Sequence, residues 1–493
     1  SMVQWNYPIL ATAVRNVPPI LEARMSDLSS SSTTEPVATE RAARRSYPMY
    51  VFWIMFAISF LNYLDRNVFT GAANTIAHEL GFGVDGIGFI ASAFLIIYTL
   101  CTIPLGIWAD RASRKDVVAS CVAVWSVITA LTALATNFTT LFLSRMLLGV
   151  GEAGYFPAGT ALMGDYFRRS SRSRVMSWWS VAQLIGILIG FVIGGGLAGL
   201  FIGSWRLAFL ITGIPGLILA FLAWKLREPR RNQADEEELD AGATALPDKS
   251  PAERIKTNPF LQMRDLLRIK TLVVLIVMQI LTFFVLTSSV LFLPTFLQQK
   301  DLYGLSSLKA SLFSGAVIVL AGLIGTLAGG YMADWLNRRH QGARVLICGI
   351  GFLLSAPAFA LALTARSFPL FALFFILTTI LITFYNGPST AATQDIAPSA
   401  LRASAVALSL FIAHMLGDAF SPAIVGALAR AFDPTGGLHF VNNMAGHDLS
   451  MALLITCTPA LAIAGLVGIF GAGWMKGDVA AAQEADRLAK QAA

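Results

Sequence analysis

The chain has 493 residues, of which 56% are hydrophobic and only 13% are charged, and its formal net charge is +7. A soluble domain is about 45–50% apolar and about 25% charged, so this composition excludes a soluble enzyme, a disordered regulator and a secreted disulfide scaffold. It predicts a helical protein that crosses a membrane many times. In such a protein a basic excess indicates positively charged cytoplasmic loops, and no nucleic-acid partner is expected.

Residues 1–47 are polar and contain no apolar run long enough to span a bilayer or to form a signal peptide. We expect a cytoplasmic tail that is disordered or in part an artificial extension, with Met25 as the candidate natural start.

Twelve apolar segments follow, each near the roughly 20 residues that a transmembrane helix needs. They form two sets of six, which predicts an N-terminal bundle at 48–226 and a C-terminal bundle at 267–476. The polar interval 227–266 carries the run Glu236–Glu238 and is typical of a solvated cytoplasmic linker. Residues 477–493 are expected to form a cytoplasmic tail. The expected spans are 48–73, 86–108, 116–135, 139–165, 174–200, 206–226, 267–298, 306–333, 343–364, 367–394, 401–430 and 450–476.

Basic residues in the short loops predict the orientation. One side carries clustered cations and the other carries isolated ones, so both termini and the linker are expected in the cytoplasm. The first set is Arg41, Arg44, Arg45, Arg111, Arg114, Lys115, Arg168, Arg169, Arg172, Arg174, Arg338, Arg339, Arg344 and Arg402, and the second is Arg206, Lys300, Arg366 and Arg430.

The two halves repeat each other. The segment Gly106–Lys115 and the segment Gly330–Arg339 place Gly, Asp and a basic pair at identical spacing after the second span of each set. A second echo follows the fourth span, where an aspartate precedes an arginine by seven residues in both halves: Asp165 and Arg172, Asp395 and Arg402. Parallel six-helix repeats are an architecture of secondary transporters.

These motifs resemble a known family. The loop Gly106–Lys115 resembles the signature loop of the major facilitator superfamily, and the resemblance runs from about residue 48 to 476. Three stretches, Asn62–Arg66, Arg145–Ala153 and His414–Pro422, resemble the spinster subgroup, including its bacterial homologues. Organic-anion symporters of the superfamily carry a similar Asn-Tyr-x-Asp-Arg helix.

The resemblance implies an all-α fold of twelve transmembrane helices in two pseudo-symmetric six-helix bundles, and sphingolipid-like or lysolipid cargo. It also implies that the charged loops form a latch between the halves and act in gating. The loop residues concerned are Gly106, Asp110, Arg111, Arg114, Lys115, Asp334 and Arg338.

Four charged residues lie within or at the ends of apolar segments. Asp65 and Arg66 form either an interfacial pair that snorkels to the headgroups or a buried, proton-titratable pair. Arg145 and Glu152 are seven residues apart, so two helical turns place them on one face, roughly 10 Å apart. They form either a structural ion pair between helices or a polar stripe facing a central cavity.

In the functional interpretation the four charges sum to zero. Asp65 and Glu152 would take up and release a proton, while Arg66 and Arg145 would bind an anionic group and balance the carboxylates.

Other polar residues within the spans have two interpretations. His414 and Asp418 share a helical face and serve either as a proton relay or in helix packing. Ser288 on the seventh span, and Tyr385 and Asn386 on the tenth, are candidates for substrate contact, although interhelical hydrogen bonding explains them equally well.

Together these features predict a proton-coupled secondary transporter of an amphipathic, anionic, lipid-like solute, monomeric and embedded in the inner membrane. The alternative is a proton-coupled symporter of a small organic anion such as a sugar acid. A receptor or an intramembrane enzyme is a third reading, but HExxH, GxSxG and GxxxxGK[ST] motifs are absent. The four cysteines lie in apolar stretches without CxxC spacing. No metal or cofactor is therefore expected; protons, a small substrate and membrane lipids are the expected partners.

Overall fold

The computed structural model describes residues 35–230, 259–340, 342–398 and 401–492, and every regular element among them is helical. The expectations for the first 34 residues, including Met25, and for Glu236–Glu238 lie outside the described residues. The chain divides into two units, residues 1–51 and 52–493. All packing discussed below lies within the second unit.

The first six spans are built from seven helices. Asn137 begins the fourth span with a capping box, in which its side chain accepts a hydrogen bond from the Thr140 N–H. The same span is interrupted at Gly154, where a Cβ atom would lie 2.8 Å from Cys121 Sγ. The helices are α2 (Glu35–Leu80), α3 (Val84–Arg111), α4 (Arg114–Thr132), α5 (Phe138–Ala153), α6 (Tyr155–Tyr166), α7 (Arg169–Ala198) and α8 (Trp205–Trp224).

The second half has more interruptions. Two of its spans contain a five-residue π-helix, a feature that occurs often at functional sites. The elements are α10 (Pro259–Leu266), α11 (Lys270–Gln298), α12 (Ser307–Ala316), the π-helix η2 (Val317–Ala321), α13 (Gly322–Asn337), α14 (Ala343–Leu363), α15 (Phe368–Thr383), α16 (Asn386–Ile396), α17 (Arg402–Ala413), the π-helix η4 (His414–Asp418), α18 (Ser421–Phe432), α19 (Leu438–Val441), α20 (Gly446–Gly471), the 3-10 helix η5 (Ala472–Trp474) and α21 (Met475–Ala492).

Among the described residues, 11 helices are long and apolar enough to cross a membrane. The remaining expected span is the α5–α6 pair, whose 16-residue and 12-residue helices are each too short to cross alone. The all-helical membrane fold predicted from the sequence is confirmed. Three boundaries differ: α2 continues to Leu80, α10 lies within the predicted linker, and α21 occupies the predicted C-terminal tail.

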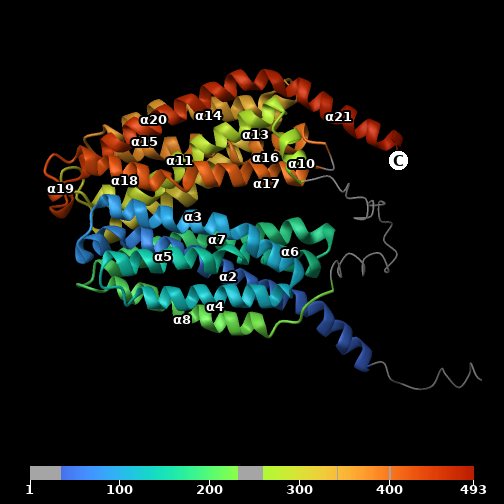
Figure 1. Ribbon diagram of the computed structural model, residues 1–493, viewed down its shortest axis with the longest axis horizontal. Coiled ribbons are helices and arrows are strands. Elements are labelled where there is room, and N and C mark those ends of the chain that lie inside the picture. Colours follow the sequence, from blue (N-terminus) through green and yellow to red (C-terminus); the bar gives the residue numbers. More distant parts are fainter. Residues whose placement is uncertain (1–34, 231–258, 341, 399–400, 493) are drawn as a thin grey trace, which may run out of the picture. The chain divides into compact units, whose positions relative to one another are not determined.

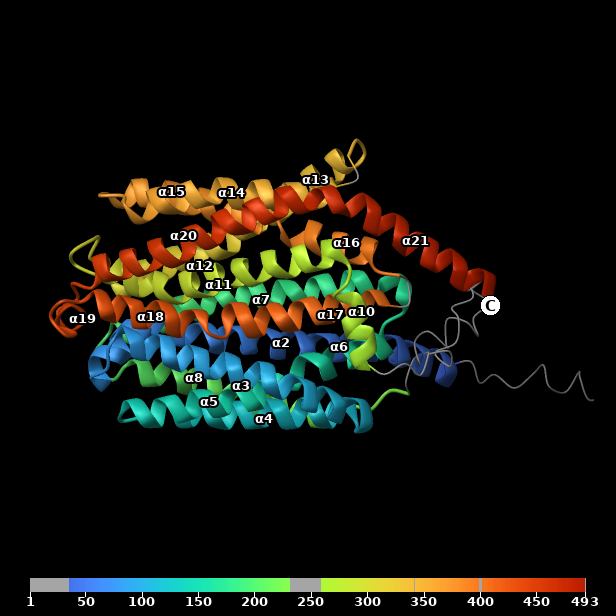
Figure 2. The ribbon, with the colours of Figure 1, turned by 45° about the horizontal axis from the view of Figure 1, so that its top comes forward.

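The helices form two bundles, one of α2–α8 and one of α10–α20, which lie side by side in Figure 1. Contacts between the bundles gather at the end that holds α19, where α3 packs on α18 and α7 packs on α12 (Figure 2). We call this the closed end, and we call the opposite end, which holds the Gly106–Lys115 segment and α10, the loop end.

Within the first bundle, α7 packs on α2 through glycines. Cβ atoms at Gly186, Gly190 and Gly194 would each collide with a backbone carbonyl of α2; for Gly190 the distance to Leu64 O would be 2.5 Å. Small residues at this seam allow the two helix backbones to approach closely.

We therefore expect Gly190→Ala to lower the thermal stability of the detergent-solubilised protein. Forcing a methyl group into a packed seam costs about 1–3 kcal/mol. Gly330→Ala is the matched control, because no heavy atom would lie within 4 Å of the added Cβ atom, and the higher helix propensity of alanine then keeps or raises stability. Equal melting temperatures for Gly190→Ala and wild type would contradict the tight seam.

Candidate functional site

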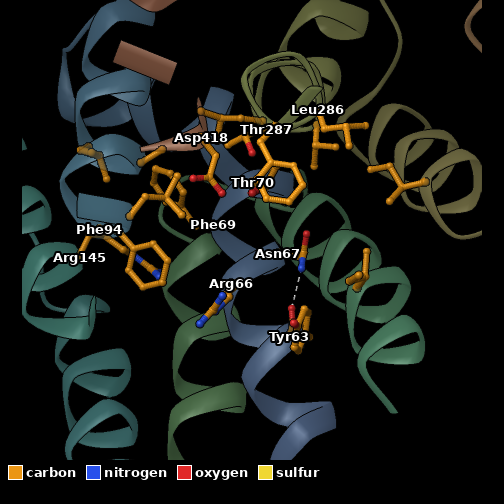
Figure 3. A pocket seen from close by; sticks show the side chains of 18 of the residues that line it. Tyr63, Arg66, Asn67, Phe69, Thr70, Phe94, Arg145, Leu286, Thr287 and Asp418 are labelled. Carbon is orange, nitrogen blue, oxygen red and sulfur yellow. Dashed lines mark hydrogen bonds between the residues drawn. The ribbon is translucent and has the colours of Figure 1, made fainter. Parts of the chain in front are cut away.

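A cavity of about 500 Å³ lies between the two bundles. Figure 3 shows Arg66 and Arg145 on the side of the first bundle and Leu286, Thr287 and Asp418 on the side of the second. The lining residues come from α2 (Tyr63, Arg66, Asn67, Phe69, Thr70), α3 (Ile90, Ala91, Phe94, Leu95), α5 (Arg145, Leu148), α7 (Ile187), α11 (Phe283, Leu286, Thr287, Val290, Leu291), η2 (Ile318) and η4 (His414, Asp418).

Aromatic rings hold the two arginines of the first bundle. The Arg66 guanidinium carbon lies 4.4 Å from the centroid of the Tyr98 ring, and that of Arg145 lies 4.5 Å from the centroid of Phe209. A guanidinium over a ring face is stabilised by the ring quadrupole and keeps its N–H groups free for other partners. The rings thus help to retain two cations in an apolar region.

The carboxylates of Asp65 and Glu152 are buried within the first bundle and do not line the cavity. Glu152 Oε2 accepts a hydrogen bond from Arg66 Nε at 2.5 Å. Asp65 accepts hydrogen bonds from the hydroxyls of Thr129 at 2.5 Å and Thr212 at 3.4 Å. The two acids are each 1% exposed, whereas the Arg66 side chain is 23% exposed. Of the four charged residues, only the two arginines line the cavity.

The partners differ from those suggested by helical spacing. Spacing pointed to a stripe of Arg145 and Glu152 along one helix, but the ion pair joins Arg66 of α2 to Glu152 of α5. Asp65 is held by hydroxyls of α4 and α8. The four charges therefore form a neutral cluster that ties four helices together.

Arg145 has unused donors. Its Nε and Nη2 atoms are buried and have no hydrogen-bond partner, and Oε1 of Glu152 is likewise without one. Unpaired buried polar atoms are costly. Since Arg145 also lines the cavity, an anionic group of a ligand is a partner that would satisfy these donors.

The opposite wall is mainly apolar, but it also carries an acid. In η4, His414 Nδ1 lies 2.8 Å from Asp418 Oδ2, and the His414 ring packs against Phe283 with a centroid distance of 4.8 Å. Asp418 Oδ1 is buried and without a hydrogen-bond partner. Both residues line the cavity, so their placement suits contact with a ligand as well as a proton relay.

Three predicted contact residues lie outside the cavity lining. Ser288 is fully buried next to the lining residue Thr287. The Tyr385 ring packs against Phe283 and Phe352, and Asn386 donates to the Thr326 hydroxyl at 2.9 Å. Apart from Arg66, sequence reasoning did not single out the aromatic and polar residues of α2 and α3 that line the cavity, although Tyr63 and Asn67 lie in or beside the Asn62–Arg66 motif.

The loop motif of the first bundle makes contacts at the loop end. Arg114 pairs with Asp165, and the backbone N–H groups of Arg114 and Lys115 donate to Glu228 at 2.9 and 3.0 Å. A carboxylate at this position caps the N-terminus of α4. Gly106 is loosely surrounded, since a Cβ there would approach only Pro157 within 4 Å, at 3.9 Å. Asp110 and Arg111 lie in the last turn of α3.

The second bundle uses a different arginine from the one that spacing suggested. Arg344, at the start of α14, pairs with both Asp395 and Asp334, whereas Arg338 stands at the C-terminus of α13. Arg344 is thus the spatial counterpart of Arg114, because each begins the third span of its half and binds the aspartate that ends the fourth. These pairs each lie within one bundle.

The sequence was compared with known proteins. Residues 55–422 match the family model described as Major Facilitator Superfamily. "Protein spinster" of Drosophila melanogaster is 26% identical over 382 residues, which are 76% of this chain and 60% of that protein. A "Sphingosine-1-phosphate transporter" of Xenopus tropicalis is 27% identical, covering 75% and 71% of the two chains. A "Probable L-galactonate transporter" of Escherichia coli is 26% identical, covering 82% and 89%.

Among solved structures, a bacterial homologue of the human lysosomal transporter spinster, in an inward-facing and unoccupied conformation, superimposes with a TM-score of 0.77. The two sequences are 24% identical, and the match covers 88% of this chain and 98% of the other. This likeness shows the fold.

We expect the buried ion pair to respond asymmetrically to substitution. Arg66→Gln leaves the Glu152 carboxylate without its cation in a site that water does not reach, and breaking such a pair costs about 3–5 kcal/mol. Glu152→Gln leaves Arg66 facing the cavity and should cost less. The double variant should lose less stability than the sum of the single losses. Melting temperatures of the purified proteins measure this, and additive, equal losses would show that the pair is not coupled.

Proposed function

Because the chain belongs to the major facilitator superfamily of membrane transporters, we propose that it moves an amphipathic, anionic, lipid-like solute by alternating access, driven by protons. The observation that carries this proposal is the division of the cavity into two unlike walls. Arg66 and Arg145 line one wall, and Phe283, Leu286 and Val290 line the facing one. A solute with an anionic head and an apolar tail complements both.

The relatives support a lipid-like cargo. Proteins named spinster, and a relative named for sphingosine-1-phosphate transport, align with three quarters of this chain. A single-chain lipid phosphate has an anion for the arginines and an apolar chain for the α11 wall. We infer that the head binds at Arg145, where unused donors are available, and that it extends toward Arg66.

Proton coupling follows from the shared use of Arg66. Glu152 and an anionic head both require this guanidinium, so a head that binds Arg66 weakens its pair with Glu152. A buried carboxylate deprived of its cation is unfavourable unless it binds a proton. Anion and proton would therefore enter together, which is the relation expected of a symporter. Asp65, the other buried carboxylate of the cluster, is the second candidate for proton uptake.

The orientation and the facing state rest on the loop charges. Arg114, Lys115 and Arg344 lie at the loop end, and basic loops face the cytoplasm. We infer that the loop end faces the cytoplasm and that the membrane is the inner membrane. We also infer that this conformation, in which the bundles are joined at the closed end, is open toward the cytoplasm.

A small organic anion is the second candidate substrate. The specific observation in its favour is that a relative named as a probable L-galactonate transporter is covered over 89% of its length. A sugar acid would use the two arginines but would leave the apolar wall without a partner.

Transport by purified protein in proteoliposomes tests the proposal. With an imposed proton gradient, we expect accumulation of a fluorescent sphingosine-1-phosphate analogue well above that in protein-free liposomes, and no accumulation of galactonate. Asp65→Asn should abolish gradient-driven accumulation but retain gradient-independent exchange of substrate, because the cavity arginines remain.

The control separates coupling from binding. Arg145→Gln should lose both accumulation and exchange, since it removes the inferred anion contact. Galactonate uptake without lipid uptake would replace the lipid proposal with the sugar-acid alternative. Undiminished gradient-driven uptake by Asp65→Asn would show that this residue does not couple protons to transport.

A further inference from the structure

A set of polar contacts joins the two bundles at the closed end, away from the cavity. On α2, Asn74 Nδ2 donates to Gln298 Oε1 at 3.3 Å and to Asn443 Oδ1 at 3.2 Å. One turn later on the same helix, His78 Nε2 lies 2.9 Å from the same Asn443 oxygen. Gln299 Nε2 in turn reaches Asn74 Oδ1 at 3.4 Å. The side-chain oxygen of Asn443 is therefore within hydrogen-bond distance of two side chains of the first bundle.

The backbone at Asn443 is unusual. It is the only non-glycine residue in the described part of the chain with positive φ, at 57°. Asparagine tolerates this left-handed conformation better than most residues. The Asn443 carbonyl oxygen also accepts a hydrogen bond from the Lys300 N–H at 2.7 Å. This bond fixes the backbone of the turn that presents the Asn443 side chain to α2.

Stacking reinforces these hydrogen bonds. The His78 ring lies on the Phe440 ring with a centroid distance of 4.7 Å and an interplanar angle of 6°. Phe440 belongs to α19 and is 2% exposed. Asn443 and Phe440 are thus two contact points for α2 on one short segment, residues 433–448, which we call the gate segment.

The gate segment is held in shape by a histidine between two acids. His439 Nδ1 lies 2.9 Å from Asp448 Oδ2 and 3.6 Å from Asp433 Oδ1. Asp433 stands at the end of α18 and Asp448 in the first turn of α20. The histidine therefore links both ends of the segment.

We propose that the gate segment closes one end of the transport pathway by docking on Asn74 and His78 of α2, and that His439 clamps it in the docked shape. The proposal rests on alternating access as the mode of transport. For the cavity to open at this end, α2 must separate from Asn443 and Phe440. The hydrogen bonds and the ring stack between α2 and these residues must then break together.

The clamp makes docking depend on pH. Hydrogen bonding to Asp448, with the charges of Asp448, Asp433 and Asp301, raises the pKa of His439 above its usual 6.5. The other charged or titratable groups nearby are His78 on α2, Lys300 just after α11, Arg430 against Gly437, and His447. A raised pKa means that the protonated clamp stabilises the docked segment at low pH. This stabilisation is lost as the pH rises through the pKa of the clamped histidine.

Distances between spin labels at the closed end test the gate. The separation of the bundles is reported by labels at Ile202→Cys and Thr364→Cys. Ile202 is 91% exposed and lies in the turn after α7, and Thr364 is exposed and follows α14. The protein is studied in lipid nanodiscs without substrate, with Cys101 replaced by serine. Asn443→Gly removes the amide but suits positive φ, and His78→Phe removes the hydrogen bond but keeps a ring against Phe440.

We expect His78→Phe, which removes one hydrogen bond, to increase the population with a long distance about fivefold. Asn443→Gly removes two hydrogen bonds and should increase that population by more. Tyr303→Phe is the matched control. It removes a 2.9 Å hydrogen bond to Ala365 O at the same end but within one bundle, and it should leave the distances unchanged. Unchanged distances in Asn443→Gly and His78→Phe would overturn the gate.

The clamp is tested by repeating the measurement between about pH 6 and pH 8.5. Wild type should open progressively at the closed end as the pH rises, whereas His439→Gln, which keeps a donor but cannot titrate, should show little pH dependence. A persisting pH dependence in His439→Gln would overturn the role of the clamp. Because these distances are measured without substrate, failed lipid transport would count against the cargo and not against the gate.

Discussion

Charge inside a bilayer has to be compensated locally, and this constraint shapes the centre of the molecule. Asp65 and Glu152 are almost completely buried; Arg66 pairs with Glu152, and two threonine hydroxyls donate hydrogen bonds to Asp65. The cost of leaving any one of them alone is large. As a consequence, an anion that binds an arginine disturbs the whole balance. In the proposed mechanism, substrate and proton are linked by electrostatics alone, without a dedicated relay between distant sites.

The distribution of strong and weak ties explains how two bundles could move against each other. Within a bundle, ion pairs such as Arg114–Asp165 and Arg344–Asp395 join successive spans at the loop end, and glycines bring α7 onto the backbone of α2. Between the bundles, the described polar contacts include hydrogen bonds of neutral amides, of a histidine and of two serine hydroxyls. Each of these is worth only about 1 kcal/mol net. Such an arrangement favours motion of whole bundles over deformation of single helices.

Much of this architecture could be predicted from the sequence, and the failures have physical causes. Hydropathy and the matched Gly106 and Gly330 motifs are sufficient for the helical bundles, because twenty apolar residues have few alternatives in a membrane. Spacing along one helix could not reveal the Arg66–Glu152 pair, since the two residues are 86 positions apart and meet through tertiary packing. In the same way, sequence spacing matched Arg338 to Arg114, whereas Arg344 occupies the equivalent place. The π-helix at His414–Asp418 and the contacts of Asn443 depend on neighbours that no local pattern records.

The π-helices bear on how the second bundle meets a ligand. Both η2 and η4 contribute to the cavity, through Ile318 and through His414 and Asp418. A π-helical turn interrupts the regular bonding of its helix, so these spans can change shape at the depth of the cavity while their ends stay packed. Asp418 faces a cavity whose other wall is cationic, and its Oδ1 atom still lacks a donor. A ligand that gives its anion to Arg145 and a hydroxyl or amino group to Asp418 would bridge the bundles through opposite charges, and it would thereby favour the state in which the two walls come closer.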